Sequence, residues 1–186
     1  MVLKDAGVVR TEKSLLSQNE LNAFNQVVLP HLGAAYNLAR WLTRNDQDAE
    51  DVVQEASLRA FKYWRSFSGR DCRSWLLAIV RNTFYSWIRE RSVQPELTDD
   101  GDVDDVPQGL PDPEISLLQK ADRETLQAAL EELPVEFREA VVFREMEGLS
   151  YKEVADITGV PIGTVMSRLA RARKRLQVYL SQGRKL

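Results

Sequence analysis

Apolar residues recur at steps of three and four positions along most of the chain, the spacing of helices with one buried side. In the first helical run, Pro30 predicts a kink or a fresh start, because proline cannot continue a helix unbroken. No segment keeps the apolar–polar alternation of a half-buried strand. The pattern predicts an all-α protein. Its expected helices cover 20–42, 49–64, 73–91, 115–133 and 136–147, with two more within 148–176.

The stretch 95–114, PELTDDGDVDDVPQGLPDPE, breaks this pattern. It holds eight acidic residues, four prolines and two glycines, and too few large apolar groups to fold alone. We therefore expect a flexible acidic linker between two small helical domains. The predicted divisions are a tail at 1–20, a first domain at 21–92, the linker at 93–115 and a second domain at 116–182.

The segment 148–176, GLSYKEVADITGVPIGTVMSRLARARKRL, predicts a helix-turn-helix. Ser150 and Glu153 have the spacing of a capping box at the start of the first helix. Gly159 can take the positive φ angle that the turn needs, and Pro161 suits the first turn of the second helix.

The second helix has two distinct stripes. The apolar positions expected to be buried are Val165, Leu169, Ala172 and Leu176. One step around the helix lies a polar stripe of Thr164, Arg168, Arg171 and Arg175. A single basic helix is more often only a solvated face. In combination with the capped first helix and the glycine turn, it favours a helix that reads the major groove of DNA.

The 186-residue chain is 28% charged, with a formal net charge of −3. After Asp156 it contains no acidic residue but many arginines and lysines, which indicates partners of opposite character for different parts of the chain. No apolar run is long enough for a membrane span and the N-terminus lacks the pattern of a signal peptide, so we expect a cytoplasmic protein without membrane insertion. Cys72 is the only cysteine, and His31, the only histidine, has no evident catalytic partner. The sequence predicts no enzyme, no metal site and no cofactor.

Two other helices carry polar groups that allow two interpretations. Acidic residues early in the 49–64 helix can stabilise its N-terminus through the helix dipole, or form a surface for a basic partner. The first explanation is the simpler one. In the 73–91 helix, Trp75 and Phe84 are expected in the core. Arginines interleaved with Tyr85 and Trp87 suit opened or single-stranded nucleic acid, where bases stack on rings.

The chain resembles a bacterial RNA polymerase sigma factor of the extracytoplasmic-function (ECF) type, with sigma domains 2 and 4 only. The resemblance extends from Leu21 to Leu180. It rests on DAEDVVQEASLRAF (48–61), WLLAIVRN (75–82), the linker, and LPVEFREAVVFREMEGLSYKEVADITGVPIGTVMSRLARARKRL (133–176). It implies an alternative sigma factor that binds core polymerase and directs promoter-specific initiation. An anti-sigma factor is the further partner that it implies, and the linker would run toward the RNA exit path.

The resemblance also implies three sets of site residues. The polymerase set, expected on the clamp helices of the largest subunit, is Asp48, Glu50, Asp51, Gln54 and Glu55. The −10 set, expected on the opened promoter element, is Arg73, Trp75, Arg81, Asn82, Tyr85, Arg89 and Arg91. The −35 set, expected on duplex DNA, is Thr164, Ser167, Arg168, Arg171, Arg173, Lys174 and Arg175. The second domain would also meet the flap region of the polymerase.

The chain departs from the family pattern at four places. Ser86 stands where Asp is frequent, and Arg89-Glu90-Arg91 stands where a richer arginine cluster is frequent. Met166 stands where lysine is frequent, and Cys72 where phenylalanine is common. We interpret Cys72 as a core residue rather than a redox sensor. The alternative function is a stand-alone helix-turn-helix regulator that does not join polymerase. That alternative accounts for 148–176 but leaves the acidic 49–64 helix and the aromatic, basic 73–91 helix unexplained.

Overall fold

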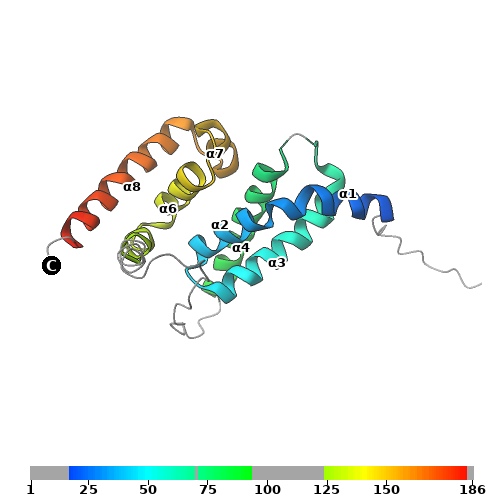
Figure 1. The fold of residues 1–186 in the computed structure, drawn as a ribbon, viewed down its shortest axis with the longest axis horizontal. Coiled ribbons are helices and arrows are strands. Elements are labelled where there is room, and N and C mark those ends of the chain that lie inside the picture. Colours follow the sequence, from blue (N-terminus) through cyan, green and yellow to red (C-terminus); the bar gives the residue numbers. More distant parts are fainter. Residues whose placement is uncertain (1–16, 70, 94–123, 184–186) are drawn as a thin grey trace, which may run out of the picture.

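The computed structural model describes residues 17–69, 71–93 and 124–183. Within those ranges the regular segments are all helical. The first domain contains α1 (Gln18–Val28), η1 (Leu29–His31), α2 (Leu32–Thr43), α3 (Asp46–Tyr63), η2 (Trp64–Ser66) and α4 (Cys72–Val93). The second contains a helix over 124–131, then α6 (Val135–Val141), η3 (Val142–Met146), α7 (Tyr151–Thr158) and α8 (Ile162–Gly183). Figure 1 shows the two groups of helices side by side.

The predicted all-α, two-domain architecture is confirmed, with small shifts at helix ends. Helix α1 begins at residue 18 because Ser17 and Glu20 form a capping box. Pro30 lies in the η1 turn, so the chain makes a fresh start at α2. Helix α3 is capped by the side chain of Asn45, which accepts from the backbone N–H of Asp48. The predicted tail before residue 17, and the linker beyond residue 93, lie outside the described residues.

The first domain packs α2, α3 and α4 against one another around small and branched side chains. Ala35, Ala39, Ala56 and Ala60 are fully buried, which allows the helices to approach closely, and Phe84 of α4 is buried as well. Full burial of one large apolar side chain contributes roughly 1.5–3 kcal/mol. Cys72 is buried in this core, as expected, and burial raises the pKa of its thiol.

The second domain is built on α6, η3 and the two helices of the helix-turn-helix. Helix α8 packs on α6 and α7 through Val165, Leu169 and Ala172, which are buried, with Leu176 partly buried. The predicted apolar stripe is thus confirmed. Ser150 and Glu153 form the capping box of α7, and Gly159 ends α7 with φ 70°. Pro161 lies just before α8 instead of in its first turn, and its carbonyl accepts from the backbone N–H groups of Thr164 and Val165.

The two domains also pack against each other, with α6 on α2 and α7 on α4. Their apolar residues form one continuous core cluster. At this junction the buried Arg138 donates to the carbonyl oxygens of Glu131 (3.0 Å), Leu133 (3.3 Å) and Leu42 (3.4 Å). Leu42 lies in the last turn of α2, where carbonyls lack helical partners, so Arg138 caps α2 from the other domain. Burial lowers the pKa of this guanidinium to about 10.

Candidate nucleic-acid interface

The polymerase set forms an acidic face along the first half of α3. Glu50, Asp51, Gln54 and Glu55 are exposed, whereas Asp48 is partly covered. The Glu55 carboxylate forms an ion pair with Arg59, one turn further along α3, with Oε1 and Nε 2.8 Å apart. Beside them Leu58 is 61% exposed, an unusual position for a large apolar side chain. The face therefore offers several carboxylates next to one apolar group, a combination suited to a basic protein partner.

The −10 set on α4 is divided between solvent and the second domain. Asn82, Arg89 and Arg91 are exposed. Arg73, Arg81 and Tyr85 are partly buried and contact residues of α6 and its continuation. Part of this set is thus open to solvent, and the second domain covers the rest.

Glu139 of α6 is the centre of the covered part. Its side chain has no exposed area. Arg81 donates to both carboxylate oxygens, with Nε–Oε2 at 2.9 Å and Nη2–Oε1 at 3.2 Å. The Tyr85 hydroxyl donates to Oε2 at 3.0 Å, and Arg168 of α8 reaches Oε1 at 3.4 Å. One buried carboxylate therefore joins a residue of each domain's predicted DNA surface.

The surroundings of Tyr85 at this site determine the pKa of its hydroxyl. Burial and the nearby carboxylate of Glu139 both oppose a phenolate, and together they raise the pKa of Tyr85 to about 12. The Arg81 guanidinium lies 4.6 Å from the centre of the same ring, in a cation–π contact. Tyr85 is thus a neutral hydrogen-bond donor over the usual pH range.

Glu147 forms a second junction at the other end of the interface. It is 6% exposed and follows η3, where its backbone N–H donates to the carbonyl of Val142, five residues earlier. Its carboxylate accepts from Arg73 and, at 2.8 Å, from the amide of Asn37 in α2. Arg73 also donates to the Glu147 carbonyl at 2.6 Å.

The aromatic members of the 73–91 helix have different surroundings. Trp75 packs with Phe67 (4.9 Å between ring centres) and with Trp64 (6.5 Å), so its ring belongs mainly to the core. Phe84 is buried, as expected. Trp87 is partly exposed. The Arg91 guanidinium lies over its ring, 4.1 Å from the ring centre.

The −35 set lies along α8 and is more open. Its exposed members are Ser167, Arg171, Arg173, Lys174 and Arg175. Thr164 and Arg168 are partly buried. Arg173 forms an ion pair with Glu145, and Arg175 lies 5.3 Å from the ring centre of Phe137. The exposed guanidinium groups therefore share one helix with a buried apolar stripe, as expected for a helix that presents cations to DNA.

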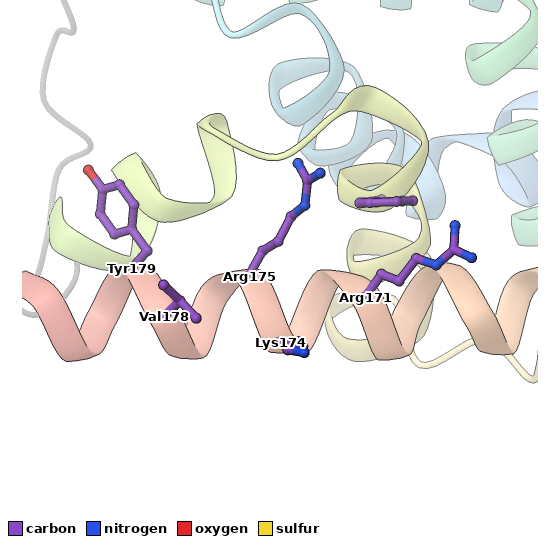
Figure 2. Close-up of a pocket in the computed structure, with 6 residues that line it drawn as sticks. Arg171, Lys174, Arg175, Val178 and Tyr179 are labelled. Atoms are coloured by element: carbon purple, nitrogen blue, oxygen red, sulfur yellow. The ribbon is translucent and has the colours of Figure 1, made fainter.

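An open cleft of about 480 Å³ lies between α8 and the α6 side of the domain. Figure 2 shows Arg171, Arg175 and Tyr179 extending from α8 across this cleft. Its lining combines the aliphatic parts of these cations with Val178 and Phe137. Such a lining suits an acidic, partly apolar segment.

Two further properties concern other kinds of site. In the described ranges there is no group of three or more His, Cys, Asp or Glu side chains arranged to hold a metal ion. None of the helices described is both long and apolar enough to cross a bilayer.

Glu139, Glu147 and Asn37 belong to none of the sets of site residues predicted from the sequence. Each acts through partners far away in the chain, such as Arg81 for Glu139 and Arg73 for Glu147. A local signal existed only for Glu139, a carboxylate directly before the apolar run at 140–143, AVVF.

Comparisons with known proteins find matches for both helical parts of the chain. Residues 27–93 match the family Sigma-70 region 2, and residues 123–176 match Sigma-70, region 4. The chain is 37% identical over 166 residues to the ECF RNA polymerase sigma factor SigE of Mycolicibacterium smegmatis, covering 89% of this chain and 64% of that protein. It is 33% identical over 171 residues to the ECF RNA polymerase sigma-E factor of Haemophilus influenzae, covering 87% of this chain and 89% of that protein.

Two solved structures resemble the fold. One is the sigma factor RpoE in complex with the anti-sigma factor NepR from Bartonella quintana, with a TM-score of 0.72 and 31% identity over 86% of this chain and 98% of that one. The other is CnrH in complex with the cytosolic domain of CnrY, with a TM-score of 0.62 and 25% identity over 87% of this chain and 90% of that one.

Proposed function

Since the chain belongs to the ECF sigma factors of the sigma-70 family, we propose that it binds core RNA polymerase and directs promoter-specific transcription initiation. One observation supports this function above others. The same chain exposes an acidic face on α3 and a cationic face on the helix-turn-helix. A regulator that binds only DNA needs the second face and has no use for the first.

In this proposal the polymerase set binds the clamp helices, the −10 set contacts the opened strand, and the −35 set reads duplex DNA. The domains are those expected from the sequence, 21–92 and 116–182, joined by the acidic segment 93–115. Leu58 adds an apolar anchor to the polymerase contact, because its exposed side chain lies beside Glu55. The chain supplies recognition in the cytoplasm, and the chemistry of RNA synthesis belongs to the polymerase.

The net charge of −3 is consistent with a factor that binds DNA weakly when free. Neutralisation of phosphates supplies much of non-specific DNA affinity, and here the basic residues are offset by acidic ones. Polymerase would hold both domains over the promoter at high effective concentration. We also propose an anti-sigma protein as a partner, because RpoE, a structural relative, was solved in complex with one.

Run-off transcription with purified core polymerase on a genomic promoter library tests the function. Addition of this protein should produce discrete start sites that share paired −35 and −10 sequences. If no transcripts form although the free protein binds DNA specifically, the chain acts as a stand-alone regulator and the proposal is wrong.

A further inference from the structure

Four residues proposed to contact promoter DNA are engaged by two glutamates of the second domain. Arg81, Tyr85 and Arg168 contact Glu139, and Arg73 contacts Glu147. The pairs run in opposite order along the chain. Arg73 and Arg81 are eight residues apart on α4, and their partners Glu147 and Glu139 are eight residues apart as well. The two contacts therefore clamp α4 at two points rather than one.

The chemistry at Glu139 resembles that of a bound phosphate. Arg81 approaches its carboxylate with two N–H groups, the bidentate geometry with which guanidinium groups also bind phosphate oxygens. The side chain of Arg81 is only 15% exposed, and that of Glu139 is not exposed at all. While this contact exists, a DNA strand has no access to these donors.

We propose that the free chain inhibits its own DNA binding through this closed arrangement, in which Glu139 and Glu147 occupy the sites of DNA phosphates. This inference rests on the proposed function, since it concerns the same DNA surface. When the interface opens, solvent or nucleic acid takes the place of each glutamate beside the α4 residues. Opening frees Arg73, Arg81 and Tyr85 of α4, whereas Arg168 lies in the same domain as Glu139 and keeps that carboxylate as a neighbour.

The free-energy cost of opening the interface lowers the apparent affinity of the chain for DNA. If DNA binds only the open form, the apparent dissociation constant is the intrinsic one divided by the open fraction. Coupling between two sites in one protein is typically about 5–150-fold in affinity. We therefore expect variants that open the interface to bind DNA tighter by a factor in that range.

Two variants of the full chain weaken the interface by different means. Glu139→Gln combined with Glu147→Gln keeps the shapes but removes both negative charges. Asn37→Asp replaces the amide that donates to Glu147 by a carboxylate, so that two like charges meet. Asn37 belongs to none of the three sets, and its replacement adds negative charge, which by itself disfavours DNA. The matched control is Glu124→Gln with Glu132→Gln, two exposed glutamates of the second domain.

Solution X-ray scattering measures the radius of gyration, and fluorescence anisotropy measures binding to a labelled forked DNA of arbitrary sequence. Circular dichroism checks that each variant keeps its helices. We expect both interface variants to expand and to bind the fork about 5–150-fold tighter than the wild type. The control variant should stay compact. Its affinity for the fork should rise only by the small amount that the loss of two negative charges causes. Asn37→Asp provides the test if the glutamine variant does not fold.

Expansion without tighter DNA binding would overturn the inference, and so would an unchanged radius in both interface variants. Failure of the proposed function has a different signature. In that case wild-type protein with core polymerase produces no promoter-specific transcripts, while the interface variants still expand and gain DNA affinity.

Discussion

Arg91 of α4 donates to the carboxylate of Asp48 in α3, with Nη1 and Oδ1 3.0 Å apart. The contact joins a member of the −10 set to a member of the polymerase set. Because Asp48 is already paired and its side chain is only 21% exposed, it is a poor position at which to test polymerase binding. Asp51 and Glu55 are exposed and provide the sharper test.

Replacing Asp51 and Glu55 by lysine should abolish binding to core polymerase and leave the fold intact. The change places two cations against a basic partner, where like charges across an interface cost several kcal/mol. Affinity for core polymerase, measured by fluorescence anisotropy, checks it. Glu132→Lys, an exposed position outside the polymerase set, should bind normally. Unimpaired binding by the double variant would exclude the α3 face from the contact.

Arg171→Ala should relax promoter preference at one base pair of the −35 element. A side chain that reads a base edge contributes about 1–3 kcal/mol of discrimination. Lys174→Ala should instead weaken transcription evenly across promoters, as expected for loss of a phosphate contact. Run-off transcription on a set of single-base promoter variants separates the two effects. An unaltered base preference in the arginine variant would make Arg171 a phosphate contact.

Gly159→Ala should destabilise the second domain by about 1–2 kcal/mol, because an L side chain is strained in the left-handed region. Gly159 has φ 70° at the end of α7. Gly33→Ala is the matched control, since Gly33 lies within α2 with nothing within 4 Å of an added Cβ. There alanine should stabilise the helix by about 0.5–1 kcal/mol. Chemical denaturation of both variants measures the difference, and equal effects would contradict the role of the turn.

Tyr85 should be the last tyrosine to ionise in the native chain. Its pKa is raised from 10.0 to about 12, so between these values the folded protein keeps a proton that the unfolded chain has lost. The resulting contribution to stability is complete below pH 10 and falls as the pH rises toward 12. An ultraviolet absorbance titration of phenolate should show a late step. Tyr85→Phe should remove that step and Tyr63→Phe, at an exposed position, should not. A late step that survives Tyr85→Phe would contradict the assignment.

Local sequence signals predicted much of this fold because their physics is local. The pair Ser150 and Glu153 specifies a cap, Gly159 specifies a turn, and the spacing of Val165 and Leu169 specifies a buried stripe. The signals were weaker where several residues compete for one role. Three neighbours, Asn45, Asp46 and Asp48, could each cap α3, and only the structure distinguishes them.

The covered part of the −10 set was not predictable in the same way. Arg81 and Tyr85 have the spacing of one helical face, and the sequence indicates that this face is polar. It does not indicate that Glu139, 58 positions after Arg81, lies against them. That contact depends on how two domains pack, and no short-range pattern encodes it. The assignment of individual residues to polymerase, −10 and −35 contacts remains a prediction.

The continuous apolar core of the two domains has a consequence for the lifetime of the free protein. Separation of the domains exposes apolar surface of both to water, and such surface is a site of aggregation. Proteases also cleave transiently opened chains in proportion to the open population when reclosing is fast. A molecule that has no polymerase to bind is therefore protected while closed, and its turnover follows the same equilibrium that controls its access to DNA.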